Sequence, residues 1–137
     1  MKASTQDTVY QGRVTLVQPE TGFRAGLDSL ALAAGLPAMD KGEALELGCG
    51  SGGALLPAAF RMPEVRFTGV EQDFGTATLA REGAVLNGFG ARVVIETDEA
   101  AGWAAAHENR FDLVFANPPY FEPGKISPPG EGKAGAY

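Results

Sequence analysis

Short apolar runs alternate with amphipathic stretches along most of this chain, and the alternation predicts its secondary structure. Four runs rich in Val, Leu, Ile and Phe have the length of buried strands, and apolar residues recur at helical spacing between them. The expected strands cover 44–47, 66–70, 92–95 and 111–116, and the expected helices cover 54–60, 73–87 (capped by Asp73) and 99–108. Strands that alternate with helices predict right-handed crossovers and a parallel sheet covered on both faces.

The front of the chain has a different pattern. Residues 9–24 combine β-branched positions with a Pro-to-Gly turn at 19–22, which predicts a small hairpin. Asp28 and Ser29 then precede an apolar run that is typical of a capped helix over 30–34. The expected fold class is therefore α/β: a partial Rossmann-like, doubly wound parallel sheet with strand order 3-2-1-4, preceded by an N-terminal hairpin.

The length of 137 residues fits one domain, since a chain of this size buries roughly two-thirds of its unfolded surface. We expect a hairpin segment over 1–27, a ligand-binding core over 28–120 and a loop or poorly ordered tail over 121–137, where Gly and Pro are frequent. No apolar stretch approaches the ~20 residues needed to cross a bilayer. A single cysteine and the absence of a secretory signal at the N-terminus lead us to expect a cytoplasmic protein.

Charge narrows the partners that the sequence favours. The formal net charge is −6, which argues against broad electrostatic attraction to nucleic acid. The acidic excess lies between residues 28 and 116, and no basic patch is visible before or after it. A role with nucleic acid must therefore rest on a specific motif.

The most informative motif directly follows the last expected strand. Asn117-Pro118-Pro119-Tyr120 must leave that strand in an extended path, because two consecutive prolines cannot donate hydrogen bonds to a sheet. The Asn117 amide can accept a hydrogen bond from an amino group, and the Tyr120 ring offers a flat face for stacking. This combination predicts chemistry on an aromatic or amide nitrogen.

A glycine-rich turn follows the first expected strand. Gly48, Gly50 and Gly53 fit the dinucleotide pattern G-x-G-x-x-G, but a plain tight turn would also explain them. Glu46, two residues before the first glycine, indicates which kind of ligand such a turn could bind. A carboxylate there would repel a pyrophosphate but suits a ligand with an ammonium group, such as S-adenosylmethionine.

Acidic residues also follow the next two expected strands. Glu71 stands 23 residues after Gly48, where an acid can accept hydrogen bonds from both ribose hydroxyls; the alternative is an ordinary solvated strand end. Asp98 could accept from an adenine amino group or simply cap the next helix. Because the carboxyl ends of parallel strands meet at one edge of a sheet, we expect these groups to line one crevice.

The remaining reactive side chains favour no further chemistry. His107 is the only histidine and is expected on a helix surface, while Cys49 and Trp103 are interpreted as packing residues. No set of His, Cys and acidic residues has metal-ligand spacing, so we expect no metal site.

Two motifs and the front segment together resemble a known family. Glu46–Gly52 with Asn117–Tyr120 resembles the motif pair of class I S-adenosylmethionine-dependent methyltransferases that modify exocyclic or amide nitrogens. The front segment, with Arg13-Val14, Gln18-Pro19 and Gly22–Ser29, is similar to the N-terminal signature of the bacterial tRNA(Val) adenine-N6 methyltransferases, which contain a methyltransferase small domain.

The resemblance implies S-adenosyl-L-methionine as the cofactor. Gly48, Gly50 and Gly52 would line its methionine end. Glu71 would bind its ribose, and Asp98 would reach its adenine.

The resemblance also implies the reaction, which is N-methylation of an adenine N6 in tRNA. Asn117 and the Pro118 carbonyl would hold the target amine, with Tyr120 stacked on the base. A glutamine side chain in a protein is the rival substrate, because the same motif serves that amide. A nicotinamide-binding domain is the least favoured alternative because of Glu46.

Members of the family have seven strands in their sheet, whereas this sequence predicts four. We therefore expect a C-terminally truncated version of the fold whose fourth strand forms an open edge. Such edges are usually paired or shielded, so a non-catalytic module that binds the cofactor and forms a homo-oligomer through this strand is a further alternative.

Overall fold

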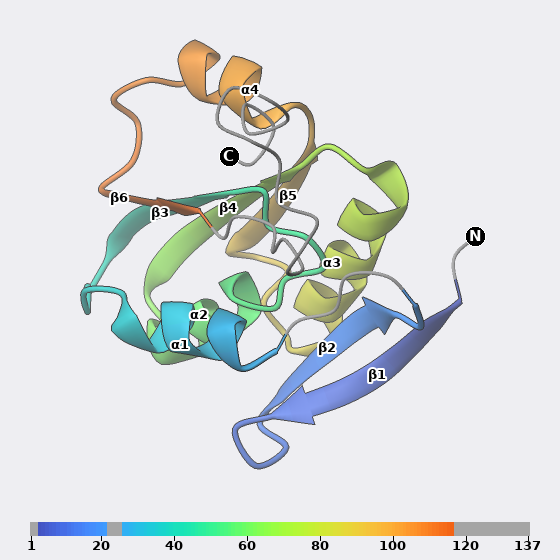
Figure 1. The fold of residues 1–137 in the computed structure, drawn as a ribbon. Coiled ribbons are helices and arrows are strands. Elements are labelled where there is room, and N and C mark those ends of the chain that lie inside the picture. Colours follow the sequence, from blue (N-terminus) through green and yellow to red (C-terminus); the bar gives the residue numbers. More distant parts are fainter. Residues whose placement is uncertain (1–2, 22–25, 117–137) are drawn as a thin grey trace, which may run out of the picture.

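The computed structural model describes residues 3–21 and 26–116, which form a parallel sheet, flanking helices and a separate hairpin (Figure 1). The sheet has the strand order β5-β4-β3-β6, and its three strand pairs are all parallel. The strands are β3 (Gly42–Leu47), β4 (Val65–Glu71), β5 (Val93–Thr97) and β6 (Leu113–Ala116). The predicted α/β class and the order 3-2-1-4 are therefore confirmed.

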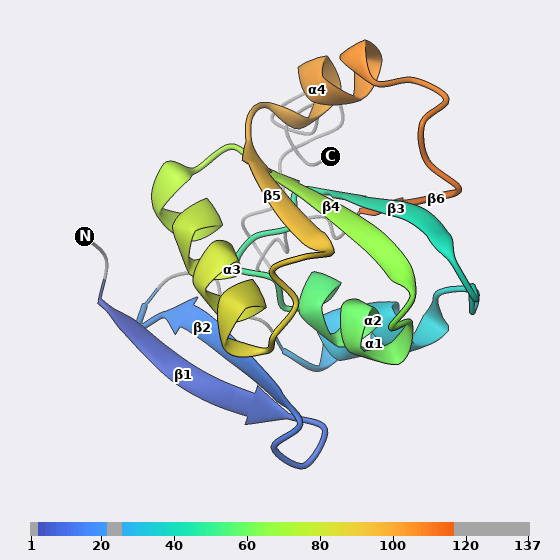
Figure 2. The same cartoon turned by 180° about the vertical axis from the view of Figure 1, so that it is seen from behind.

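Helices cover the two faces of this sheet unequally, as Figure 2 shows from behind. Three helices lie on one face: α1 (Leu27–Gly35), α2 (Leu55–Arg61) and α3 (Phe74–Leu86). The short α4 (Ala100–Ala106) is the only helix of the described residues that packs on the opposite face. We call these the α2 face and the α4 face.

Side-chain alternation explains how the central strands serve both faces. In β3, Ala44 joins the core on the α2 face, whereas Leu45 packs with Trp103 on the α4 face. In β4, Gly69 leaves room for the layer above the sheet. A Cβ at Gly69 would lie only 2.8 Å from both Cys49 Sγ and Leu55 Cδ2, so the loop before α2 and the helix itself approach the strand closely.

The N-terminal hairpin exists, but the sequence misplaced it. β1 (Ser4–Val9) pairs antiparallel with β2 (Val14–Pro19), and three residues with positive φ make the turn, namely Tyr10 at 53°, Gln11 at 58° and Gly12 at 85°. The predicted turn at 19–22 is wrong, because Pro19 still pairs with Ser4. β1 escaped detection because it carries mostly polar residues and is half-exposed along its length.

A side chain at the end of α3 fastens the hairpin to the domain. Asn87 accepts a hydrogen bond from Thr15 N at 2.8 Å and donates through Nδ2 to Thr15 O at 2.7 Å. The same Nδ2 also donates to Gly83 O at 2.7 Å. Val14 and Leu16 of β2 are thereby held in the main core, where they are 0% and 2% exposed.

Of the helix starts expected for α1 and α3, the first differs from the structure and the second agrees with it. The N-cap of α1 is Gly26, and no side chain caps this helix. Asp28 and Ser29 lie within its first turn, so the prediction that they precede and cap the helix is wrong. For α3 the prediction is confirmed, since Asp73 accepts from Thr76 N at 2.8 Å. Within the described parts of the chain, no helix has the length and apolar character needed to span a membrane.

Candidate functional site

The loop between β3 and α2 holds three glycines in left-handed backbone conformations. Their φ angles are 73° at Gly48, 58° at Gly50 and 96° at Gly52, a region that favours glycine. A Cβ on Gly48 or Gly50 would meet no atom within 4 Å, whereas one on Gly52 would lie 3.0 Å from Leu56 Cδ1. The first two glycines therefore face open space, and the third faces the packing of α2.

The Glu71 carboxylate ties this loop to the end of β4. Its Oε1 accepts from Gly50 N and its Oε2 from Asp73 N, each at 3.0 Å. Glu71 is half-buried, so it is not a freely solvated strand end. Each carboxylate oxygen has a second lone pair, which leaves acceptor capacity for hydroxyl groups of a ligand.

Glu46 is the most unusual residue of the site. It lies in β3 between Gly69 of β4 and Phe115 of β6 and is 0% exposed, yet neither carboxyl oxygen has a hydrogen-bond partner among the described residues. Burial, and secondarily the charge of Glu71, raises the pKa of this carboxyl well above its usual 4.5. A buried acid without a partner is costly to ionise, so the site favours a ligand that brings a positive charge.

Asp98 follows β5 beside these groups. Its backbone N donates to Glu71 O at 3.1 Å, and its exposed side chain accepts from Glu99 N at 2.7 Å. The cap of α4 is Glu99, which accepts from Ala101 N and Gly102 N at 2.9 Å each. The alternative prediction of Asp98 as the helix cap is therefore wrong.

The structure thus brings the predicted acids and glycines to the carboxyl ends of β3, β4 and β5. β6 ends at Ala116, which pairs with Leu47 of β3. The predicted target-binding residues Asn117, Pro118 and Tyr120 come next in the sequence and lie outside the described residues.

The other reactive side chains are packing residues. Cys49 is buried, and this burial raises the pKa of its thiol, which disfavours a nucleophilic thiolate. Trp103 stacks on His107 with ring centres 3.8 Å apart, and His107 Nδ1 lies 2.7 Å from Trp103 O. Over residues 3–21 and 26–116, no cluster of His, Cys and acidic residues could hold a metal ion.

A cavity of about 300 Å³ adjoins the glycine loop on the hairpin side, and the sequence did not predict it. Val9 and Leu16 of the hairpin, Leu27 and Leu30 of α1, and Gly53 contribute to its lining. The sequence offered one signal for this cavity: Leu27 and Leu30 are one helical turn apart at the start of α1, so their side chains lie on the same side of the helix. Leu27 is 81% exposed, so apolar surface is presented at this point.

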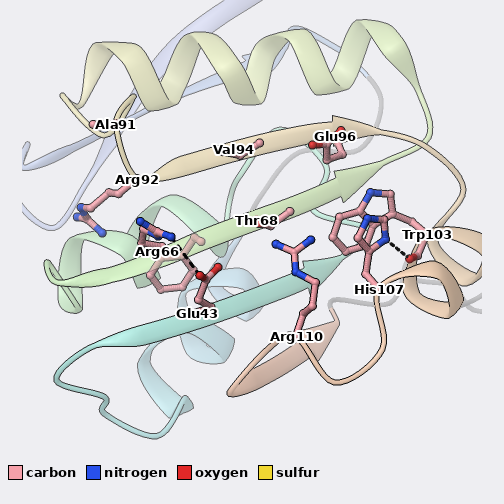
Figure 3. Close-up of a pocket in the computed structure, with 11 residues that line it drawn as sticks. Glu43, Arg66, Thr68, Ala91, Arg92, Val94, Glu96, Trp103, His107 and Arg110 are labelled. Carbon is pink, nitrogen blue, oxygen red and sulfur yellow. Dashed lines mark hydrogen bonds and ion pairs between the residues drawn. The ribbon is translucent and has the colours of Figure 1, made fainter.

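A second cavity, also about 300 Å³, lies on the α4 face and contains none of the predicted site residues (Figure 3). Arg66, Thr68 and Val94 of the sheet line it together with Trp103 and Arg110. This cavity is present because one short helix covers the face only in part. None of its lining residues belongs to the glycine loop.

Comparison with known families and proteins agrees with this geometry. The model of the methyltransferase small domain matches residues 24–128. The tRNA1(Val) (adenine(37)-N6)-methyltransferase of Salmonella enteritidis is 37% identical over 103 residues, which are 74% of this chain and 42% of that protein. The protein of the same name in Salmonella typhimurium shows the same identity and coverage. This chain therefore spans less than half the length of these curated relatives.

Solved structures agree on the fold. The SAM-dependent methyltransferase from Thiobacillus denitrificans, solved in complex with S-adenosyl-L-homocysteine, is 25% identical with a TM-score of 0.57, over 67% of this chain and 36% of that chain. The SAM-dependent methyltransferase from Agrobacterium tumefaciens is 19% identical with a TM-score of 0.68, over 89% and 42% of the two chains. With its parallel sheet, its glycine loop and the match over 24–128, this chain belongs to the methyltransferase small domain family.

Proposed function

We propose that this chain is the cofactor-binding region of an S-adenosylmethionine-dependent N-methyltransferase that acts on an adenine N6 in tRNA. The observation that carries the proposal is the buried Glu46 carboxyl without a partner, next to two glycines that face open space. An ammonium group would supply the donors and the charge that this carboxyl lacks. The amino group of the cofactor's methionine part has this chemistry.

The other loop residues fit the rest of such a ligand. The backbone at Gly48, Gly50 and Gly52 would approach the methionine part. Open space lies where side chains of Gly48 and Gly50 would be, which leaves room for this part of the ligand. Glu71 is oriented by two backbone amides and would accept from the ribose hydroxyls. Asp98 is exposed at the end of β5 and would accept from the adenine amino group.

The cofactor, when bound, supplies an electrophilic methyl group on a sulfonium centre. An aryl amine is a weak nucleophile because its lone pair is delocalised into the ring. Acceptors at Asn117 and the Pro118 carbonyl would bind its N–H groups and favour a pyramidal nitrogen, while Tyr120 would stack on the base. No strong base is needed before attack, so positioning at roughly 3–3.5 Å would contribute most of the rate.

The substrate part of the proposal rests on relatives named tRNA1(Val) (adenine(37)-N6)-methyltransferases. Protein glutamine remains the rival substrate because its amide fits the same four-residue motif. A tritium-transfer assay with bulk tRNA and with bulk protein as acceptors separates the two. Label in tRNA is expected, and label in protein alone would transfer the proposal to a glutamine substrate.

Isothermal calorimetry with S-adenosylhomocysteine tests the cofactor directly. We expect one binding site per chain. Asn117→Ala is the matched variant, because it should abolish methyl transfer and leave this binding intact. Absence of any binding at millimolar ligand would reject the cofactor assignment and the activity with it.

A second candidate is a non-catalytic module that pairs with another copy through β6. This strand pairs with β3 alone among the described residues, and its Val114 is 54% exposed. A dimer whose contact maps to 113–116, combined with cofactor binding and no methyl transfer, would favour this function.

A further inference from the structure

The interior position of Glu46 has a consequence for how the site exchanges protons. Glu46 is 0% exposed in β3, between β4 and β6, and its carboxyl group lacks a donor among the described residues. A carboxyl group in such surroundings keeps its proton, because ionisation would leave a buried charge without compensation.

The charged neighbours reinforce this state. Glu71, at the end of β4, adds a like charge that further disfavours ionisation of Glu46. Arg81 of α3 is engaged elsewhere, since it donates to Ile95 O at 3.0 Å and to Thr97 Oγ1 at 2.8 Å. The loop contributes the thiol of Cys49, while Leu55 of α2 and Phe115 of β6 are apolar. No described cation therefore pairs with Glu46.

We propose that Glu46 is protonated in the empty site and that binding of the cofactor's amine expels this proton to solvent, so that Glu46 selects ligands that carry a cation. The inference rests on the proposed function and adds a specificity residue to it. The exchange is balanced: the carboxylic acid and the ammonium ligand become a carboxylate–ammonium pair, and the O–H proton passes to the buffer.

The source of the proton can be isolated by the choice of pH. A free α-amino group has an ordinary pKa of about 7.7–8.0, so at about pH 6 the ligand already carries its proton in solution. A proton released at this pH therefore comes from the protein. The released fraction should fall as the pH rises through the pKa of Glu46 in the empty site.

Calorimetric titration at about pH 6 in two buffers of different ionisation enthalpy, phosphate and bis-Tris, counts this proton. With S-adenosylhomocysteine we expect release approaching one proton per ligand. Two controls should release none: 5′-methylthioadenosine, which lacks the amino acid part, bound to the native chain, and S-adenosylhomocysteine bound to Glu46→Gln. The isosteric Glu46→Gln variant should also bind S-adenosylhomocysteine about tenfold or more weakly, in line with the loss of a charge-assisted hydrogen bond.

The outcomes separate the two levels of the argument. Tight binding of S-adenosylhomocysteine with the same enthalpy in both buffers would overturn the proton coupling and leave the proposed function standing. Equal proton release with 5′-methylthioadenosine would also overturn it, and this comparison needs no variant to fold. No binding of S-adenosylhomocysteine would reject the function and the inference together.

Discussion

The two faces of the sheet come from the same four strands but differ in how completely they are covered. On the α2 face, helices and the hairpin bury a continuous core that includes Leu55, Leu56 and Phe67. On the α4 face the buried cluster consists of Leu45, Val70 and Trp103. The core therefore lies mainly on the α2 face, where close packing holds the glycine loop before α2 in its conformation, and the α4 face contributes far less to stability.

A large-to-small substitution in the covered core should have the largest effect. Phe67 is 1% exposed in β4, and Phe67→Ala should lower the free energy of unfolding by about 3–5 kcal/mol because it removes buried contacts and leaves a cavity. Urea denaturation followed by circular dichroism measures the change. A loss below about 1 kcal/mol would mean that this face is not the main source of stability.

Glu46 connects stability to pH on the same face. A carboxyl group whose pKa is raised in the folded state destabilises the protein progressively as the pH rises from its unfolded value toward its folded one. Glu46→Gln should therefore stabilise the cofactor-free chain by a margin that grows with pH, at up to about 1.4 kcal/mol per pH unit within that window. Thermal unfolding of both proteins between about pH 4 and pH 8 provides the measurement, and parallel curves would argue against a protonated Glu46.

The attachment of the hairpin can be tested by a substitution at the end of α3. Asn87→Ala removes both hydrogen bonds to Thr15 and should cost about 1–3 kcal/mol, because a backbone amide and carbonyl lose their partners. Hydrogen exchange should become faster mainly in β1 and β2. Unchanged exchange there would show that apolar packing of Val14 and Leu16 alone holds the hairpin.

The smallest effect is expected on the α4 face. Val94 is 50% exposed on β5, so Val94→Ala should change stability by less than about 0.5 kcal/mol. The matched variant Val65→Ala makes the same chemical change at a residue that is 0% exposed on the α2 face, and it should cost several times more in the same urea assay. Equal costs would break the distinction between the two faces.

Local signals in the sequence predicted the parts of the fold that depend on nearby residues. Apolar runs separated by helical periodicity identified the four sheet strands, and Asp73 was correctly interpreted as a helix cap. Prediction failed where two adjacent residues could each cap the same helix. Asp98 and Glu99 both have carboxylates, and only the path of the chain after β5 decides that Glu99 reaches the amides of α4.

Long-range contacts decided the remainder. β1 consists of polar residues whose strand conformation depends on pairing with β2, so no local pattern could identify it. The face of the sheet that each helix covers is also decided by the assembled structure. The sequence of a crossover helix does not specify this face, because it depends on where the next strand joins the sheet.

The sequence by itself determined the order of the four sheet strands and the helices between them, because periodicity acts over a few residues. It also determined the glycines of the first turn and the acid two residues before the first of them. Only the tertiary structure decided that this acid, Glu46, is fully enclosed and without a partner among the described residues. Burial depends on strands that are distant in sequence, Gly69 and Phe115 on either side. Their packing raises the pKa of an ordinary strand residue and makes it suited to a cationic ligand.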